Sequence, residues 1–251
     1  MKQLWWITLV SLVLFGCATN QPGGSNSAAE DNTTNRARAH TELGAAYFQQ
    51  GKMEIALEEF TEATKIDANY GLAYNGLGLV HAALGQDAEA DASFKQSISL
   101  EPNNSKSHNN YGDFLCSHQR YDESIVQFLA ALKNPLYATP SVAYANAGIC
   151  SARKNDLKAA EGYLKKSLQL EPLMHSAALQ LAQIQFDRGD VKSAKTTLQN
   201  ALVAGQSPEV LWMGIKISRA LADKDAESSY ALELRKQFPN SEQTKLLLSG
   251  Q

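Results

Sequence analysis

The chain has 251 residues, of which 44% are hydrophobic and 20% are charged, and its formal net charge is −3 at pH 7. This balance argues against a nucleic-acid partner, because such proteins normally carry a basic stripe. The length suits a repeat array with one continuous core, and we see no second domain.

The first 17 residues resemble a bacterial lipoprotein signal. Lys2 precedes an apolar run from Leu4 to Phe15, and this 12-residue run is too short to cross the hydrocarbon core as a helix. The run continues into the lipobox-like string LFGC, which ends at Cys17. We therefore expect a signal peptide over residues 1–16 and acylation of Cys17 with chains such as palmitate. An uncleaved anchor or a non-lipidated signal is the alternative.

Residues 17–35 are expected to be a lipidated cysteine followed by a flexible linker. The segment is rich in Gly, Ser, Asn and Thr, and it has too few apolar groups to pack. Lipoproteins of this type tend to stay in the inner membrane when aspartate follows the cysteine, but here the next residue is Ala18. The resemblance therefore implies the periplasmic face of the outer membrane, in a Gram-negative bacterium.

From about residue 37 onward, the sequence repeats at an interval close to 34 residues. Aromatic or leucine residues mark one position of the period: Phe60, Phe94, Phe128, Leu164, Leu198 and Leu232. Small residues mark a second: Ala56, Ala90, Ser124, Ala160, Ala194 and Ser228. This period is typical of tetratricopeptide repeats, whose helix–turn–helix units bury their apolar faces only against neighbouring units. We predict an all-α, right-handed superhelix, an α-solenoid.

The repeat domain is expected over residues 36–251. Its six repeats are placed at about 37–70, 71–104, 105–138, 141–174, 175–208 and 209–240. Two extra residues fall between the third and fourth repeats, where Pro135 and Pro140 end one helix and offset the next. The sixth repeat is degenerate, with Lys216 at a position held by glycine in earlier repeats. Ser241 is expected to cap a final helix within the segment 241–251.

Two cysteines remain once Cys17 is assigned to lipid. Cys116 and Cys150 lie on the first helices of the third and fourth repeats, which should be neighbours. In an oxidising compartment this pair favours a disulfide, which would stabilise the fold by about 3–4 kcal/mol by closing a loop of about 35 residues. The alternative is two buried thiols that pack as small apolar residues.

Catalysis finds no support in the sequence. The five histidines show no metal-ligand spacing, and no nucleophile elbow or phosphate loop is present. We therefore expect no catalytic residue, no metal, no cofactor and no small-molecule substrate. A cell-wall or lipid-modifying activity is the enzyme alternative, and no arrangement of acid, base and nucleophile favours it.

Recurring positions of the first helices line the inner face of such a superhelix. One row contains Thr41, Asn75, Asn109 and Ala145, and the next contains Ala45, Leu79, Asp113 and Ile149. Apolar side chains near these rows offer a groove for a peptide: Phe48, Leu72, Leu79, Ala82, Val142 and Ile149. Packing between neighbouring repeats would explain the same residues equally well. The lysines with which chaperone-binding members of the superfamily clamp a carboxylate are not found at such positions.

Several strings of this sequence resemble the type IV pilus biogenesis lipoproteins of the PilF/PilW kind. They are Asn109-Asn110-Tyr111-Gly112-Asp113-Phe114-Leu115-Cys116, Asn134-Pro135-Leu136-Tyr137, Asn146-Ala147-Gly148-Ile149-Cys150 and Phe238-Pro239-Asn240-Ser241. The resemblance extends from the lipobox to the end of the chain. Members of that family are pilotins, which the pilus secretin needs in order to localise or assemble as a multimer. Both Cys116 and Cys150 fall in these strings, so the resemblance also supports the bridge.

The resemblance implies an outer-membrane pilotin that binds type IV pilus secretin subunits and thereby serves pilus biogenesis and twitching motility. We expect the partner to contact seven residues: Asn75, Leu79, Asn109, Asp113, Tyr137, Asn146 and Ile149. The alternative is a tetratricopeptide lipoprotein that serves another envelope machine, such as outer-membrane protein insertion or type II secretion.

Overall fold

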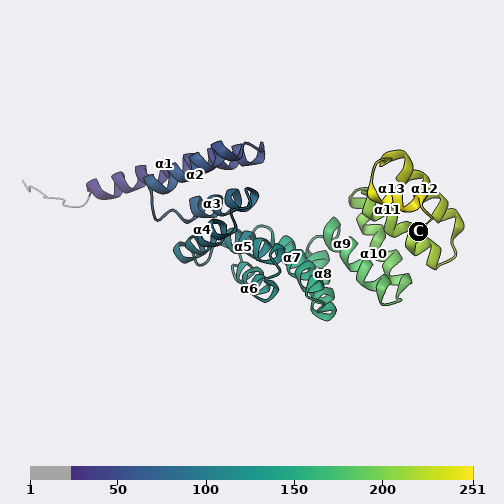
Figure 1. Ribbon diagram of the computed structural model, residues 1–251. Coiled ribbons are helices and arrows are strands. Elements are labelled where there is room, and N and C mark those ends of the chain that lie inside the picture. The colour runs from purple at the N-terminus through teal and green to yellow at the C-terminus, as the bar shows by residue number, and fades with distance from the viewer. Residues whose placement is uncertain (1–23, 251) are drawn as a thin grey trace, which may run out of the picture.

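The computed structural model describes residues 24–250, which form 13 helices and no strand. The helices follow one another in an elongated solenoid, with α1 at one end and α11 to α13 at the other (Figure 1). The predicted all-α superhelix is confirmed. The expected signal peptide over residues 1–16, the acylation site Cys17 and the start of the expected linker lie outside the described residues.

The helices pair into six helix–turn–helix units, and a short helix closes the array. The pairs are α1 (Gly24–Gln49) with α2 (Met53–Ile66), α3 (Gly71–Ala83) with α4 (Asp87–Leu100), α5 (Ser105–Ser117) with α6 (Tyr121–Ala131), α7 (Pro140–Arg153) with α8 (Leu157–Leu170), α9 (His175–Asp187) with α10 (Val191–Ala204), and α11 (Pro208–Ala220) with α12 (Lys224–Gln237). The closing helix is α13 (Glu242–Leu248).

The 34-residue period arises from how the two helices of a unit cross. A Cβ added to Gly78 would lie 2.7 Å from the ring of Phe94, and one added to Gly112 would lie 2.7 Å from the ring of Phe128. Atoms at such distances overlap, so the first helix needs glycine where the large side chain of the second helix meets it. The repeated pairing of a small with a large residue is therefore a packing requirement.

The sixth repeat departs from the predicted register by one residue. The left-handed residue in the turn between paired helices is Gly189 (φ 86°) in the fifth unit and Ala222 (φ 56°) in the sixth, which are 33 residues apart. The connection between α10 and α11 has three residues, 205–207, whereas the connection between α8 and α9 has four, 171–174. The missing residue therefore lies in the α10–α11 connection.

This slip corrects the assignment of core residues in the last repeat. Leu232, predicted as a core residue, is 60% exposed, whereas Leu234 is fully buried. Ser228, expected at a packed position, is also exposed. The small-residue position given to Lys216 belongs to Ile215, which is fully buried.

Lys216 instead lies at the edge of the inner face. Its Nζ donates a hydrogen bond of 2.8 Å to Gln183 Oε1 and lies 5.4 Å from the centre of the Phe186 ring. Partial burial lowers the pKa of the Lys216 ammonium, and the nearby Asp187 opposes this shift.

The first helix begins earlier than the sequence predicted. A flexible linker was expected to residue 35, but α1 begins at Gly24. The packed part of α1 starts near Thr34, whose Oγ1 donates to Asp67 Oδ2 at 3.0 Å, and Ala37 is fully buried. The preceding segment 28–30 contains two alanines and a glutamate, which have high helix propensity and extend the helix toward the N-terminus.

The first helices of the units line the concave side. Over the described residues, α1, α3, α5, α7, α9 and α11 each contact the next in this series, whereas the second helices do not contact one another. Helices on the inside of a curved stack lie closer together than those on the outside. The predicted inner-face rows therefore lie on the concave surface.

The C-terminal end is capped as predicted. Ser241 accepts a hydrogen bond of 3.1 Å from the backbone N–H of Thr244, which satisfies one free donor of α13. Thr244 is buried and donates from Oγ1 to the carbonyl of Phe238 at 2.7 Å. Leu247 packs on the buried Leu211, so α13 shields the last repeat from solvent.

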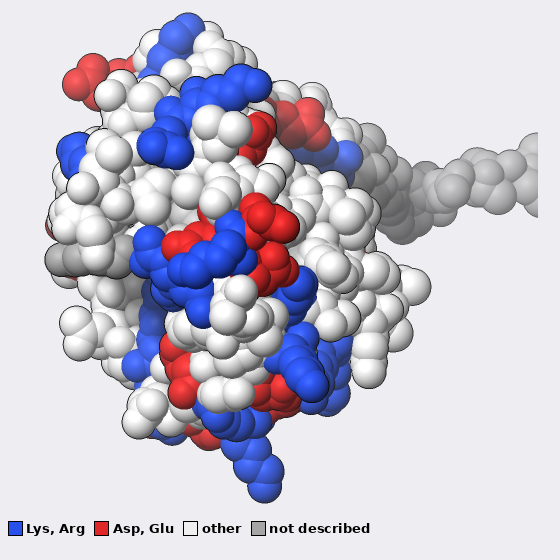
Figure 2. Space-filling view, turned by 90° about the vertical axis from the view of Figure 1, so that its right-hand side faces the viewer, with Lys and Arg blue, Asp and Glu red and all other residues white. Residues whose placement is uncertain are grey.

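Charges of both signs are mixed over the end of the molecule that carries the last repeats (Figure 2). Some belong to ion pairs, such as Lys195 with Asp223 at 3.2 Å and Arg219 with Glu227 at 2.8 Å. Among the helices between residues 24 and 250, none has both the length and the apolar character needed to cross a bilayer.

Tyr111 connects the second and third repeats through a buried hydroxyl. It is 3% exposed and donates a hydrogen bond of 2.9 Å to Asp91 Oδ1, which also accepts a bond from Arg120. Burial and the bond to Asp91 raise the pKa of Tyr111 to about 12.

The raised pKa of Tyr111 predicts a loss of stability at high pH. The folded state favours the neutral phenol, so this contribution is complete below about pH 10 and is lost as the pH rises toward 12. Between about pH 9 and about pH 11, the free energy of unfolding of the wild type should fall by about 1.4 kcal/mol more than that of Tyr111→Phe. Denaturant titrations at both pH values measure this difference, and equal losses in the two proteins would contradict the assignment.

Candidate functional site

A groove opens on the concave face of the first three repeats. Its walls come from α1, α3 and α5, and its volume is about 520 Å³. The lining comprises Arg38, Thr41, Glu42, Ala45, Phe48, Gln49, Phe60, Tyr70, Leu72, Asn75, Gly76, Leu79, Lys106 and Asn110. Most of its apolar surface comes from Phe48, Leu72 and Leu79, which remain partly exposed.

Helical spacing explains why α1 presents one wall. Arg38, Thr41, Ala45 and Phe48 follow one another at intervals of three or four residues, so they form a stripe along one side of the helix. On α3 the lining includes Gly76, which has no side chain to fill the groove. A Cβ there would lie 2.2 Å from the ring of Phe60, so this position cannot carry a larger residue without rearrangement.

Asparagine side chains join neighbouring first helices across the concave surface. Asn110 Nδ2 on α5 donates a hydrogen bond of 3.1 Å to Asn75 Oδ1 on α3. Asn146 Nδ2 on α7 donates a longer one of 3.3 Å to Asn109 Oδ1. Asn75 is only 4% exposed, so it holds Asn110 in place and presents little surface to a ligand.

The seven residues expected to contact a partner do not form a single site. Asn75 and Leu79 line the groove, but Asn109 and Asn146 form a separate pair further along the concave face. Ile149 packs against the cluster between α7 and α9, so contacts within the fold account for much of its apolar surface.

Asp113 lies on the concave side of α5 beyond the groove lining. More than a third of its surface is exposed. Removal of water by the surrounding protein nevertheless raises the pKa of its carboxyl, and the charge of Arg153 partly offsets this effect.

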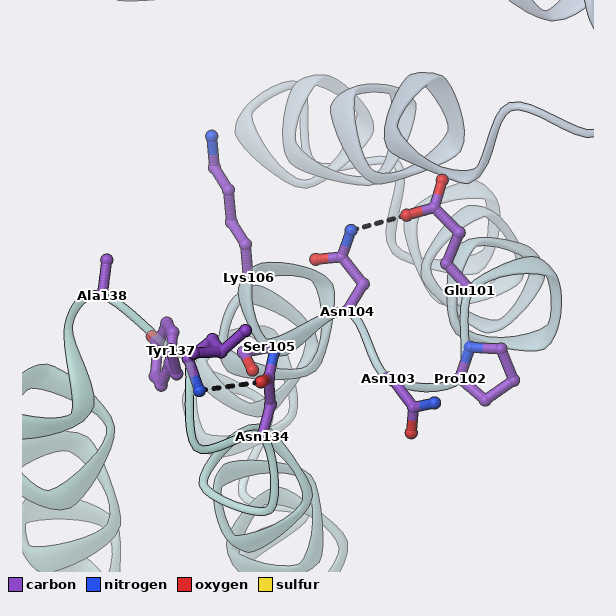
Figure 3. Close-up of a pocket in the computed structure, with 10 residues that line it drawn as sticks. Glu101, Pro102, Asn103, Asn104, Ser105, Lys106, Asn134, Tyr137 and Ala138 are labelled. Atoms are coloured by element: carbon purple, nitrogen blue, oxygen red, sulfur yellow. Dashed lines mark hydrogen bonds between the residues drawn. The ribbon is translucent and has the colours of Figure 1, made fainter.

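Tyr137 belongs to a second cavity, at the edge of the superhelix. This cavity has a volume of about 500 Å³ and lies between the connections α4–α5 and α6–α7. Two hydrogen bonds shape it: Asn104 Nδ2 donates to Glu101 Oε2 at 2.6 Å, and the backbone N–H of Leu136 donates to Asn134 Oδ1 at 2.9 Å (Figure 3). The exposed side chain of Leu136 lies next to Tyr137 in the chain and is 88% accessible.

Two basic residues of the groove were missed by the sequence analysis, which found no lysines suited to binding a carboxylate. Arg38 on α1 and Lys106 on α5 both belong to the lining. The side chain of Lys106 extends away from Asn134 into open space (Figure 3). A usable signal was present, because Lys106 precedes Asn110 by four residues and therefore shares its face of the helix.

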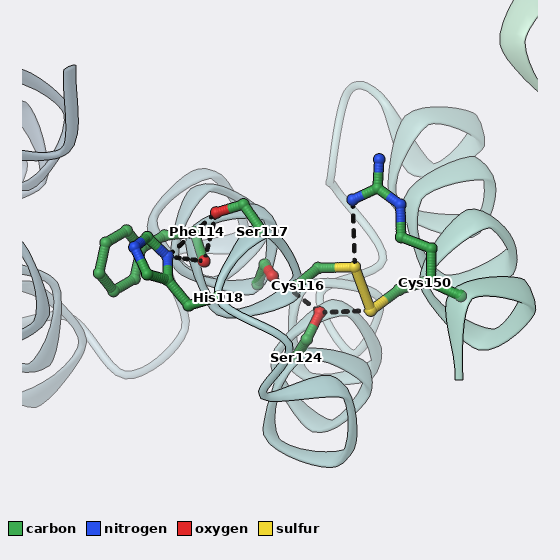
Figure 4. Close-up of a disulfide and its surroundings, with 8 residues drawn as sticks. Phe114, Cys116, Ser117, His118, Ser124 and Cys150 are labelled. Atoms are coloured by element: carbon green, nitrogen blue, oxygen red, sulfur yellow. Dashed lines mark hydrogen bonds between the residues drawn. A yellow bond between two sulfur atoms is a disulfide. The ribbon is translucent and has the colours of Figure 1, made fainter. Parts of the chain in front are cut away.

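The predicted pair of cysteines is bonded in the structure. Cys116 on α5 and Cys150 on α7 form a disulfide with a Cα–Cα distance of 5.9 Å, within the usual range. Both residues are buried. Ser124 Oγ lies 3.2 Å from Cys150 Sγ, and Arg153 Nη1 lies 3.9 Å from Cys116 Sγ (Figure 4). The bridge joins the third and fourth repeats, between which the two extra residues occur.

Within residues 24–250, no group of three or more His, Cys, Asp or Glu is placed to hold a metal ion. Family models described as tetratricopeptide repeat match the chain in four segments, 44–85, 72–104, 93–126 and 152–212.

Three similarities extend over most of the chain. The type IV pilus assembly protein PilF of Pseudomonas aeruginosa is 29% identical over 94% of this chain and 93% of its own length. The crystal structure of PilW, described as a widely conserved type IV pilus biogenesis factor, is 32% identical, covers 84% of this chain and 98% of that one, and has a TM-score of 0.77. The structure of P. aeruginosa PilF is 26% identical, covers 88% and 100% of the two chains, and has a TM-score of 0.79.

Proposed function

Because the chain belongs to the tetratricopeptide repeat family of type IV pilus biogenesis proteins, we propose that it is a pilotin. In this proposal it is an outer-membrane lipoprotein that binds subunits of the pilus secretin and promotes their localisation and multimer assembly. It acts by binding and carries out no reaction.

The groove on the concave face is the observation that supports a binding function. Phe48, Leu72 and Leu79 keep part of their apolar surface exposed there, which is unfavourable in water unless a partner covers it. The groove also offers the hydroxyl of Thr41 and the amide of Asn110 beside this surface. Apolar pockets next to hydrogen-bonding groups are a recurrent way of binding peptide segments.

The lipid on Cys17 would keep a captured subunit near the membrane. Tethering raises the effective concentration of a bound partner around the anchor, which favours assembly of a ring from several subunits. More than one acyl chain on Cys17 would make this attachment stable, since one chain alone binds a bilayer only marginally.

Deleting the gene and restoring it with variants tests the proposal. Heat- and detergent-resistant secretin multimers should disappear from outer-membrane fractions and return with the wild-type gene. Leu79→Asp should restore fewer than about a tenth of them, because the burial of a carboxylate against apolar groups costs several kcal/mol. Cys17→Ser should fail to place multimers at the outer membrane. Immunoblots of unheated fractions measure all of these outcomes.

Two further variants separate binding from folding. Leu79 also packs against the cluster around Phe94, so Leu79→Asp affects stability as well as the groove. Thr41→Trp fills the groove from α1 without changing that cluster and should give the same loss. Leu232→Asp places the same charge on an exposed leucine of α12 and should restore multimers fully. If multimers and their location are unchanged by the deletion, the protein is a scaffold for another envelope machine, such as outer-membrane protein insertion or type II secretion.

A further inference from the structure

The groove carries two cations that have no carboxylate partner in the described part of the chain. Arg38 and Lys106 stand on opposite walls, on α1 and α5, and neither belongs to an ion pair among residues 24–250. Arg120, by contrast, pairs with Asp91 and Glu123.

The charge of the groove is opposite in sign to that of the chain. The lining has two basic residues, Arg38 and Lys106, and one acidic residue, Glu42, so its formal charge is +1. The whole chain has a formal charge of −3. Unpaired cations beside an apolar surface attract a carboxylate, which can accept charge-assisted hydrogen bonds from both guanidinium and ammonium groups.

The charged and apolar parts of the groove lie toward opposite ends. Lys106 is the second residue of α5, whereas Leu79 lies in the C-terminal half of α3. On α1, Phe48 follows Arg38 by ten residues, which is a rise of about 15 Å. An extended peptide covers this distance with about four or five residues. Asp113 follows Lys106 by seven residues on α5, about 10 Å along the axis, and would repel a carboxylate at that end.

We propose that the groove binds an extended segment of the partner in which a carboxylate lies between Arg38 and Lys106 and apolar side chains follow toward Phe48 and Leu79. This inference rests on the proposed function, because it takes the groove to be the site of the secretin. It adds the chemistry and the direction of the bound segment. The carboxylate belongs either to an Asp or Glu side chain or to the C-terminus of the partner.

Selection from random peptide libraries tests this chemistry without knowledge of the partner segment. The full-length protein in detergent is presented to two heptapeptide libraries, one displayed within a loop and one with a free C-terminus. We expect peptides enriched in a carboxylate followed by apolar residues. Enrichment of Asp and Glu in the loop library indicates a side-chain carboxylate, and recovery from the free-end library alone indicates a terminal one.

Charge variants then test the two basic residues. The dissociation constant of a selected peptide should rise about tenfold or more for the double variant Arg38→Gln/Lys106→Gln. It should rise similarly when the carboxylate of the peptide is replaced by an amide. Lys192→Gln removes an exposed lysine from α10, outside the groove, and should have no effect. Fluorescence anisotropy of the labelled peptide measures each affinity.

The results separate this inference from the proposed function. The inference is wrong if the wild type selects no peptides, selects peptides without a carboxylate, or binds them as tightly in the double variant. Capture of secretin from solubilised membranes, measured in parallel, addresses the proposed function. If the double variant captures secretin as the wild type does while Thr41→Trp does not, the groove binds the secretin without using these charges. If acidic peptides bind but no secretin is captured, the partner is a different protein.

Discussion

Replacing Phe94 with alanine should lower the free energy of unfolding by about 3–5 kcal/mol. Phe94 is fully buried between the second and third repeats. Its ring centre lies 5.5 Å from that of Tyr111 and 5.5 Å from that of Phe114. Alanine would remove these contacts and leave a cavity, and Gly78, which meets the Phe94 ring, has no side chain to fill it.

Urea titration followed by circular dichroism measures the effect of Phe94→Ala. Leu232→Ala is the matched control, because the sequence period placed Leu232 at the equivalent position and the structure leaves it 60% exposed. Its effect should be within about 0.5 kcal/mol. Equal effects of the two variants would show that the sixth repeat keeps the predicted register. In a repeat protein the loss should be greatest in the second and third repeats, where hydrogen exchange should accelerate most.

Removal of the disulfide should cost about 3–4 kcal/mol. Cys116 and Cys150 are 34 residues apart, and cross-linking them restricts the unfolded chain by an amount that depends on the length of this loop. The double variant Cys116→Ser/Cys150→Ser keeps side chains of similar size at two buried positions, so the loss reports mainly the bond.

Reductant provides an internal control for this prediction. The wild type in reductant should unfold at the same urea concentration as the double variant, which should itself be insensitive to reductant. Cys17→Ser should behave as the wild type in both conditions. An unchanged midpoint on reduction of the wild type, with free thiols confirmed by labelling, would mean that the bond does not stabilise the fold.

The fold was predictable because each large core residue has a small partner at a fixed interval. Gly78 with Phe94 and Gly112 with Phe128 are examples in which steric fit selects both residues. The sixth repeat was misplaced because α12 contains two leucines, Leu232 and Leu234, and their chemistry does not show which one faces the core. The shorter connection before Pro208 decides this, and its length becomes evident only from the helix ends.

The candidate site was predictable only in part. The inner-face rows gave Leu79 and Asn75, because a position that recurs once per repeat occupies the same face of each first helix. Lys106 and Arg38 escaped because the groove is bounded by three helices, and which turns of each reach the opening depends on how the helices pack. Tyr137 was misplaced because a family-like string does not reveal which side of the superhelix carries it.

The disulfide also has a mechanical consequence for a molecule held by one end. When tension is applied along a solenoid, repeats can peel away one after another, and each releases its stored length of chain. The bond between Cys116 and Cys150 keeps the 34 residues between them out of any such extension, which withholds about 115 Å of contour. A pulling force would therefore find a fixed link in the middle of an otherwise extensible spring, next to the repeats that form the groove.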